Sequence, residues 1–375
     1  MSANNNSNHA YIKRNKILVM IPAAKIGGAE KMMMVILESL RSAGNIIVLA
    51  VGSSEGGNKA IIDASEYVLG NDRARGSIRQ CIRILVMEQP DIVFLNLGYL
   101  NLAGFVRIAS PRIKIVARLG NTVTAELPSN RFLRNIKILI LKIVCMACTK
   151  VIVQSELMKT DLLSVIRLDK GKVIVVPNVV ENDFRYKMSQ PNSLNVEKYI
   201  FCAATFKRQK RIDLLVTAAA MVMSQVENIE LVVAGTSRQE VESAGLLENI
   251  DSQILKRIHF IGFIDNILPL IRDSLFCVSS SDYEGSSNYL IEANAMNKLC
   301  LVTDCPGANR ETFHESKNAI FISPGNAALL AQGMLSAIDR VALAPLCSLD
   351  LLSETSNILD EQKSLWQGRL LEAFA

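Results

Sequence analysis

Two glutamates, Glu284 and Glu292, are the residues of this chain best suited to chemistry. Glu292 lies in an apolar stretch, residues 288–296, that is typical of a buried helix. A carboxylate in such a helix needs a hydrogen-bonding partner, because an unpaired buried charge is strongly unfavourable. Glu284 lies in the preceding loop, and residues 285–287 present free backbone N–H groups to anions at the predicted helix start. Two carboxylates and these amides suit a ligand with hydroxyl and phosphate groups; the alternative is a serine-capped helix with two incidental glutamates.

A pair of glycines, Gly27 and Gly28, follows the first predicted strand. Glycine lets the backbone approach a phosphate closely, although an ordinary tight turn between strand and helix would also use it. The loop lacks the G-x-G-x-x-G spacing, so a nicotinamide cofactor is disfavoured.

Short apolar runs alternate with helical patterns along most of the chain. The first half is predicted to contain strands at 16–21, 46–51, 91–95, 113–118, 150–153 and 172–176, and helices at 29–43, 75–89, 131–147 and 155–168. The second series of strands is predicted at 199–204, 229–234, 257–261, 275–279, 299–303 and 319–322. Such uniformly apolar strands, separated by helices, indicate parallel sheets covered on both faces. We therefore expect an α/β fold of two doubly wound, Rossmann-like domains, with the site at the carboxyl ends of the strands.

A polar segment divides the two series. The predicted organisation is a disordered lead-in at 1–15, an N-terminal Rossmann-like domain at 16–180, a linker at 181–198, a C-terminal Rossmann-like domain at 199–345, and a helical segment at 346–375 that packs back on the N-terminal domain.

Composition excludes several protein classes. With 375 residues, 50% of them hydrophobic, 20 Gly and 10 Pro, the chain is neither disordered nor collagen-like. Residues 1–180 carry 24 Lys and Arg against 12 Asp and Glu, whereas residues 181–375 carry 17 against 24. The net charges, +12 and −7, suggest that the first half faces an anionic partner; a basic surface without a partner is the alternative.

The predicted helix at 131–147 is apolar and basic. Its apolar run, 136–148, has thirteen residues and two lysines, whereas a membrane span needs about 20 apolar residues. A helix of this kind could lie on a membrane surface or form part of the core of the first domain.

The eight cysteines mostly lie in apolar runs, as free buried thiols do, which indicates a reducing cytoplasm. Cys145 and Cys148 form a C-x-x-C pair, but no second pair follows and the three histidines are distant, so zinc is disfavoured. The first sixteen residues do not resemble a secretory signal.

The segment with Glu284 and Glu292 resembles the signature of the retaining GT-B glycosyltransferases of family 4. Further segments resemble motifs of that family in the same order: Ile26-Gly-Gly-Ala-Glu30, Val151-Ile-Val-Gln-Ser155, Val175-Val-Pro-Asn178, Gln209-Lys210 with Ile212-Asp-Leu-Leu215, and Thr303-Asp-Cys-Pro-Gly-Ala-Asn-Arg-Glu311.

The resemblance implies that the domain at 16–180 lies on the acceptor side and that the domain at 199–345 binds the nucleotide sugar, and it implies roles for single residues. Glu292 would accept hydrogen bonds from the ribose of a nucleotide sugar, Glu284 would hold the transferred sugar, and Lys210 would stabilise the diphosphate leaving group. The implied catalytic residues are Glu284 and Lys210, and the implied donor-binding residues are Glu292, Gly285, Ser286, Ser287, Asn288, Gly27, Gly28, Thr205, Lys207, Arg208 and Gly262.

Three positions depart from the family pattern. Asn178-Val-Val-Glu181 stands where the family has Asn-Gly-Val-Asp, so a turn that depends on glycine is not expected there. Thr205 stands where the family usually has Arg, so Lys207 or Arg208 would supply the charge. Asn121 stands where many relatives place a His that faces the sugar, and we expect it on the acceptor or sugar side.

The implied activity is transfer of a sugar from a nucleotide-diphosphate sugar, most simply a UDP-sugar, with retention and without a metal or other cofactor. The acceptor would be a lipid-linked molecule or an oligosaccharide of bacterial polysaccharide or lipopolysaccharide assembly, met at the cytoplasmic face of the inner membrane; nucleic acid is not an expected partner. The alternatives are a catalytically silent nucleotide-sugar-binding or scaffold subunit and a GT-B nucleotide-sugar epimerase.

Overall fold

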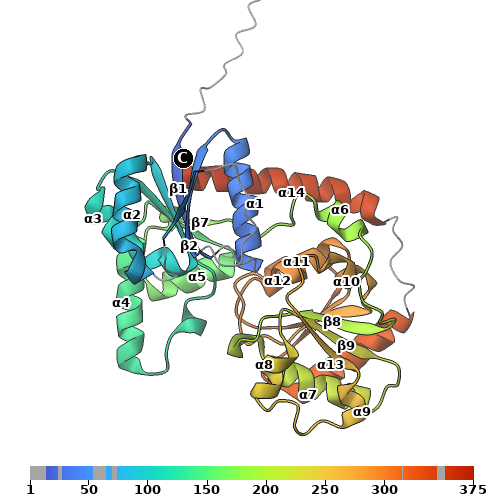
Figure 1. Ribbon diagram of the computed structural model, residues 1–375. Coiled ribbons are helices and arrows are strands. Elements are labelled where there is room, and N and C mark those ends of the chain that lie inside the picture. Colours follow the sequence, from blue (N-terminus) through green and yellow to red (C-terminus); the bar gives the residue numbers. More distant parts are fainter. Residues whose placement is uncertain (1–13, 24–27, 54–64, 70–73, 315, 344–350) are drawn as a thin grey trace, which may run out of the picture.

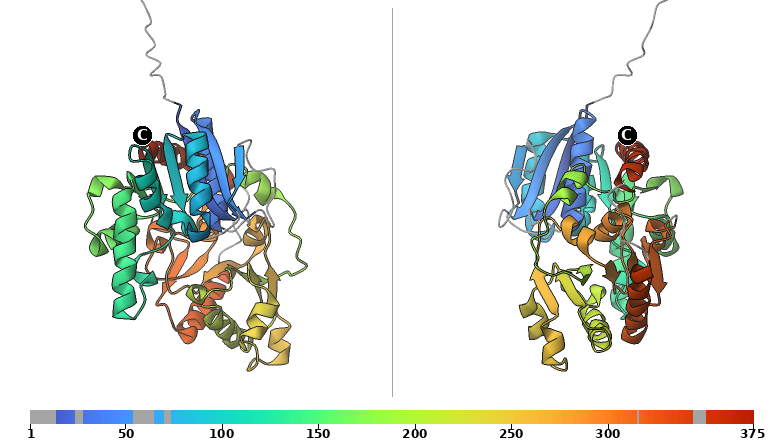
Figure 2. Two further views of the ribbon diagram at one scale, coloured as in Figure 1. Left: turned by 60° about the vertical axis from the view of Figure 1, so that its left-hand side comes forward. Right: turned by 90° about the vertical axis from the view of Figure 1, so that its right-hand side faces the viewer.

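Two α/β domains lie against each other in the computed structural model (Figure 1). The structure describes residues 14–23, 28–53, 65–69, 74–314, 316–343 and 351–375. Each domain contains one parallel sheet with helices on both faces, as Figure 2 shows from two further sides. The α/β class and the two doubly wound sheets predicted from the sequence are confirmed.

The first domain is built on a seven-stranded sheet of order β3-β2-β1-β4-β5-β6-β7, in which all paired strands run parallel. Apolar residues dominate its strands, because both faces of the sheet are covered. The strands are β1 (Lys16–Ala23), β2 (Ile46–Ser53), β3 (Ser65–Val68), β4 (Ile92–Asn96), β5 (Lys114–Arg118), β6 (Lys150–Val153) and β7 (Val173–Val175).

The helices of this domain connect successive strands. Asn130 caps α4 by accepting hydrogen bonds from two backbone N–H groups, and Ser155 caps α5 in the same way with one. The helices are α1 (Gly28–Ser42), α2 (Ala74–Glu88), α3 (Ala103–Ala109), α4 (Arg131–Ala147) and α5 (Glu156–Val165).

The second domain contains a six-stranded parallel sheet of order β10-β9-β8-β11-β12-β13. Its strands are β8 (Tyr199–Ala203), β9 (Glu230–Ala234), β10 (Ile258–Gly262), β11 (Phe276–Ser279), β12 (Cys300–Thr303) and β13 (Ala319–Ile322). Its helices are α7 (Ile212–Met223), α8 (Arg238–Ser243), α9 (Ser252–Leu255), α10 (Leu268–Asp273), α11 (Asn288–Ala295), α12 (Asn309–Thr312) and α13 (Ala327–Leu343).

The last helix, α14 (Leu351–Phe374), returns to the first domain (Figure 1). Phe374 packs edge-on against Phe94 of β4, with ring centroids 5.1 Å apart. Trp366 is buried in the same core, and its indole N–H donates to the carbonyl of Pro177 at 2.8 Å. The carboxyl end of α14 is therefore part of the hydrophobic core of the first domain.

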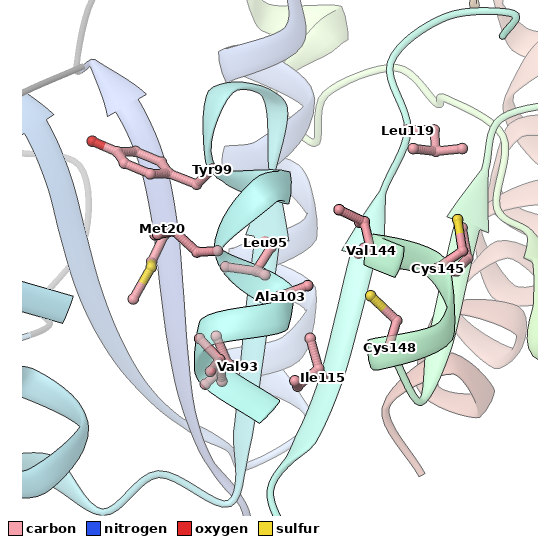
Figure 3. Packing of buried hydrophobic residues seen from close by; sticks show 14 of the residues in the cluster. Met20, Val93, Leu95, Tyr99, Ala103, Ile115, Leu119, Val144, Cys145 and Cys148 are labelled. Atoms are coloured by element: carbon pink, nitrogen blue, oxygen red, sulfur yellow. The ribbon is translucent and has the colours of Figure 1, made fainter. Parts of the chain in front are cut away.

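The cysteines of the C-x-x-C pair are core residues. Cys145 and Cys148 are buried at the end of α4, in the cluster that also contains Val144 and Ile115 (Figure 3). Burial raises the pKa of Cys145 to about 11 and that of Cys148 to about 12, because the thiolate is the less stable form in an apolar environment. Both side chains serve packing.

Two elements differ from the sequence-based expectation. The short edge strand β3 has the sequence Ser-Glu-Tyr-Val, which lacks an apolar run, and it was not predicted. The segment predicted as a linker, 181–198, contains α6 (Phe184–Ser189), and Phe184 and Met188 are buried in a core of the second domain. This segment thus packs on the second domain.

Candidate active site

Glu284 and Lys210 form a buried ion pair at the carboxyl ends of β11 and β8. Lys210 Nζ lies 2.6 Å from Glu284 Oε1, and the side chains are 17% and 5% exposed. Ser281 Oγ also donates to Glu284 Oε1, at 2.6 Å. The two residues implied to be catalytic therefore contact each other directly, and each compensates the charge of the other away from solvent.

Several hydrogen bonds hold the Lys210 segment against the Glu284 loop. Lys210 ends the 3₁₀ turn Arg208–Lys210, and its carbonyl accepts from Ser280 Oγ at 2.7 Å. Gln209 binds the loop twice: its backbone carbonyl accepts from the Asp282 N–H at 2.9 Å, and its side-chain amide donates to the Tyr283 carbonyl at 2.7 Å. These contacts fix the ion pair independently of the first domain.

The segment after β12 binds the Glu284 loop through backbone hydrogen bonds. The Glu284 N–H donates to the carbonyl of Pro306 at 2.8 Å, and the Ala308 N–H donates to the carbonyl of Gly285 at 2.9 Å. Gly307 adopts φ +138°, and a Cβ there would collide with the Glu284 carbonyl. Only glycine allows this approach.

Glu292 lies in a pocket to which both domains contribute. The pocket is lined by Lys31 of α1 together with Glu181, Phe184, Lys187, Asn266, Ile267, Leu268 and Glu292. Burial is the main cause that raises the pKa of Glu292, to about 7; Lys31 and Lys187 act to lower it and Glu181 acts to raise it. Glu292 Oε2 is buried and accepts no hydrogen bond from any residue that the structure describes. It is an acceptor available to a ligand in this pocket.

Asn288, the first residue of α11, connects the domains. Its side-chain amide donates to the carbonyl of Gly28, and its Oδ1 accepts from Asn178 Nδ2 at 2.6 Å. Asn178 Nδ2 also donates to the carbonyl of Ser286, at 3.3 Å. The implied donor loop, residues 285–288, thus touches the start of α1. Ser287 precedes α11, but its side chain does not cap the helix.

A second set of contacts joins the domains at the start of α5. The carboxylate of Glu311 accepts from the backbone N–H groups of Glu156 and Leu157, at 2.9 and 2.8 Å. Helix N-termini favour such acceptors because their first N–H groups have no partner within the helix. At the edge of the pocket, Lys31 Nζ donates to the carbonyl of Asp265 at 2.6 Å.

The remaining donor-side residues lie at the same edge of the second sheet. Thr205, Lys207 and Arg208 are exposed, and neither basic side chain forms an ion pair with a described carboxylate. Gly262 ends β10 with φ +65°, and no atom lies within 4 Å of the position a Cβ would take. The Lys207 carbonyl accepts from the backbone N–H of Lys210 at 2.9 Å, and Arg208 begins the turn that Lys210 ends.

Asn121 follows Gly120, which contacts the donor loop, but the Asn121 side chain binds a residue of its own domain. Its amide donates to Glu126 Oε1 at 2.8 Å. The preceding residue, Gly120, contacts Gly285 of the other domain. Of the two implied glycines near the first strand, Gly28 is described, whereas Gly27 lies outside the described residues.

Sequence reasoning did not single out Lys31 or Arg211. Lys31 reaches the Glu292 pocket from α1, and its neighbours in sequence gave no sign of this. Arg211 adopts φ +48° and pairs with Asp213 at 2.9 Å and with Asp282 at 3.1 Å. Its position directly after Lys210 was the available signal.

Helix α4 exposes most of its length. Its exposed large apolar residues are Phe132, Leu133, Ile136, Leu139, Ile140, Ile143 and Met146, and only Val144 and Cys145 are buried. Arg131, Arg134, Lys137 and Lys142 are basic residues of the same helix. In the described part of the chain, no helix is long and apolar enough to cross a membrane. Nor does this part bring three or more His, Cys, Asp or Glu side chains together as a metal site would require.

Comparison with solved structures gives the same arrangement of two domains. Sucrose-phosphate synthase from Thermosynechococcus elongatus matches with a TM-score of 0.74 and 17% identity, over 96% of this chain and 97% of that one. HepE from Anabaena, solved with UDP-glucose, matches with a TM-score of 0.73 and 14% identity, over 96% and 99%. These likenesses show the GT-B fold.

Sequence comparison reaches relatives and families. The poly(ribitol-phosphate) alpha-N-acetylglucosaminyltransferase of Staphylococcus aureus is 23% identical over 194 residues, which are 52% of this chain. The chain spans between 32% and 41% of the length of the curated relatives it matches. Residues 26–184 match the model described as Glycosyltransferase Family 4, and residues 197–340 match the model described as Glycosyl transferases group 1. The two matches take in both domains and the paired glutamates, and the chain belongs to family 4 of the GT-B glycosyltransferases.

Proposed function

We propose that this protein transfers a sugar from a UDP-sugar to a saccharide or lipid-linked acceptor in bacterial polysaccharide or lipopolysaccharide assembly, with retention of configuration. The observation that carries the proposal is the buried Lys210–Glu284 pair together with Glu292. Glu284 lies in the loop just before α11, and Glu292, on that helix, lines a pocket. HepE was solved in complex with UDP-glucose, and this complex and the glycosyltransferase relative support the choice of substrate class.

In the proposed reaction, Lys210 neutralises the charge that develops on the diphosphate as the glycosidic bond breaks. A group that interacts most strongly with the developing charge stabilises the transition state more than the bound donor. Glu284 keeps Lys210 in place and accepts hydrogen bonds from the hydroxyls of the sugar. Glu292 Oε2 accepts a hydrogen bond from the ribose. The acceptor hydroxyl attacks the anomeric carbon from the face that the diphosphate leaves, and the departing phosphate takes the proton of that hydroxyl. The proposed reaction uses no metal or other cofactor.

The surface of α4 supports an acceptor held at an anionic membrane. Basic residues attract anionic lipid, and exposed apolar side chains insert at the boundary between headgroups and acyl chains. The name of the Staphylococcus aureus relative includes a polymer with phosphate groups, which is compatible with an anionic acceptor for the basic first domain.

The alternatives are a silent binding subunit and an epimerase. Epimerase chemistry would be expected to use histidine and acidic groups at the site. Of the described histidines, His259 pairs with Glu230 at the amino end of β9, on the edge opposite the site, and His314 is exposed after α12. The described residues therefore favour transfer.

Titration with UDP, followed by a hydrolysis assay with UDP-sugars and no acceptor, tests the proposal. A transferase binds UDP and slowly releases free sugar from a matching donor. Binding of UDP without any release of sugar indicates the silent subunit, and formation of an epimeric UDP-sugar indicates the epimerase. Absence of UDP binding contradicts the proposal as a whole.

A further inference from the structure

Three polar side chains form a row at the carboxyl edge of the first sheet: Asn96 at the end of β4, Arg118 at the end of β5 and Gln154 after β6. Asn96 pairs in register with Arg118, and Arg118 pairs with Ile152, two residues before Gln154. Side chains alternate between faces along a strand. All three therefore lie on the sheet face whose core includes Phe94, Val116 and Ile152.

The row is buried and its hydrogen-bonding capacity is largely unused. Asn96, Arg118 and Gln154 are 0%, 1% and 5% exposed. Asn96 Nδ2 and Oδ1, Arg118 Nε and Gln154 Oε1 have no hydrogen-bond partner in the described part of the chain, whereas Gln154 Nε2 donates to the Leu119 carbonyl at 3.3 Å. Buried polar groups in folded proteins are nearly always satisfied, so these unsatisfied atoms on neighbouring strands indicate groups that are reserved for a ligand.

Arg118 also lacks a counter-ion among the residues that the structure describes. Among the described residues it donates one hydrogen bond, from Nη2 to Asn178 Oδ1 at 2.5 Å, and it pairs with no carboxylate of that part of the chain. Burial lowers the pKa of Arg118 to about 10. A buried cation without a counter-ion is unfavourable, and an anionic ligand would relieve this.

Arg107 of the same domain shows what a structural arginine looks like here. Its guanidinium donates to the carbonyls of Ala147, Pro111 and Ile113 at 2.6–3.0 Å. Arg118 donates to a side-chain oxygen of Asn178 instead of to several backbone carbonyls. Packing of the first domain therefore does not account for its charge.

The row faces the implied donor loop of the second domain. Gln154 Oε1 lies 3.0 Å from the position of a Cβ on Gly285. Asn178, the partner of Arg118, binds the Ser286 carbonyl and Asn288. A ligand on the row would consequently lie between the two domains, opposite the loop that follows Glu284.

We propose that Asn96, Arg118 and Gln154 form a subsite for the phosphoryl group of a sugar phosphate or polyol phosphate, reached when the domains separate. The inference rests on the proposed function for the source of the phosphate. Arg118 and Asn96 Nδ2 donate to phosphoryl oxygens, whereas Gln154 Oε1 and Asn96 Oδ1 accept from neighbouring hydroxyls. The phosphate belongs either to the UDP-sugar or to the acceptor. Arg118 would then contribute a cation from the first domain, in addition to Lys207 or Arg208 of the second.

Calorimetry on the full chain with two probes, UDP-glucose and glycerol 3-phosphate, tests the subsite and separates the sources. Arg118→Met and Asn96→Leu should each weaken binding of the same probe by about tenfold or more, as expected for loss of a hydrogen bond to a charged group. Loss of UDP-glucose binding assigns the subsite to the donor, and loss of glycerol 3-phosphate binding assigns it to the acceptor.

The Tm distinguishes a ligand-binding role of these residues from a structural role. Arg118→Met and Asn96→Leu should leave the Tm unchanged or raised, because each removes unsatisfied polar groups. The matched control, Arg107→Met, should lower the Tm and leave both affinities unchanged. The subsite is disproved if Asn96→Leu and Arg118→Met bind both probes like the parent, or if the parent binds neither. The proposed function fails separately, when UDP-sugars are neither bound nor hydrolysed while glycerol 3-phosphate still binds through Arg118.

Discussion

Gly285 of the donor loop lies against the carbonyl of Gly120 in the other domain so closely that a single methyl group would not fit between them. The contact joins the loop that follows Glu284 to the segment that follows β5. The glycine at 285 is therefore required by the approach of the domains rather than by the geometry of its own loop.

Gly285→Ala should reduce turnover about a hundredfold, the effect of misplacing reacting groups by about an ångström, while the Tm stays near that of the parent. Kinetics on the matching UDP-sugar and thermal unfolding measure the two effects. Gly307→Ala is the matched control, because its Cβ would collide within the second domain at φ +138°. That variant should lose about 1–3 kcal/mol of stability. Parental turnover in Gly285→Ala would show that the domains need not meet at this point.

Lys210→Met should lower kcat more than donor affinity, and it should also destabilise the protein. Removing one member of a buried ion pair leaves the other charge uncompensated and costs about 3–5 kcal/mol. The double variant Lys210→Met with Glu284→Gln should recover most of this stability but no activity. A double-mutant cycle by chemical denaturation checks the stability, and a kcat equal to that of the parent in Lys210→Met would remove Lys210 from the mechanism.

Binding of UDP-glucose should strengthen as the pH rises from 6 to 8. Burial raises the pKa of Glu292 to about 7, and the deprotonated carboxylate is the stronger acceptor for ribose hydroxyls. UDP-glucose is a suitable probe because its diphosphate, esterified at both ends, does not titrate in this range. Glu292→Ala should weaken binding by about 1–3 kcal/mol at pH 8, and Glu292→Gln should bind without the pH dependence. The same dependence in Glu292→Gln would assign it to another group.

The same shift predicts the pH dependence of stability. A carboxyl group with a raised pKa in the folded state binds more protons there than in the unfolded chain, so stability falls as the pH rises from about 4.5 to 7. Glu292→Gln should therefore raise the Tm relative to the parent at pH 8 and change it little at pH 4.5. Equal differences at the two pH values would contradict a buried, titrating Glu292.

Liposome co-sedimentation tests the surface of α4. Binding should require anionic lipid, weaken with salt, and fall when Arg131, Arg134, Lys137 and Lys142 are replaced by Ser, since each basic residue contributes about 1 kcal/mol. Replacing Phe132, Leu139 and Ile143 by Ser should abolish insertion at any salt concentration. Val86 and Met87 of α2, which are also exposed, provide the control replacement. Equal binding to neutral and anionic vesicles, or none, would favour an acceptor away from the membrane.

The predicted strands agree with the observed ones because strands buried on both faces are apolar along their whole length. The edge strand β3 escaped prediction because an edge strand needs no such run, and Ser65–Val68 is half polar. The helix α6 was not predicted because its segment is mostly polar. Phe184 and Met188 are its two buried residues, too few to give a recognisable helical pattern.

The paired glutamates were accessible to sequence reasoning because their spacing and their helix mark them. The buried row was not, because Asn96, Arg118 and Gln154 come from three strands that are far apart in the chain and meet only in the sheet. The role of Lys31 at the Glu292 pocket depends on the approach of the domains, which no local pattern encodes.

The return of α14 to the first domain means that the polypeptide passes between the domains twice. Helix α14 lies along the start of the outgoing passage, since the indole N–H of Trp366 donates to the carbonyl of Pro177 and Lys363 Nζ donates to the carbonyl of Glu181. A second chain segment held beside the first lets the domains rotate about one axis but restricts their twisting and sliding relative to each other. The donor loop would therefore meet the first sheet in the same register each time the halves come together.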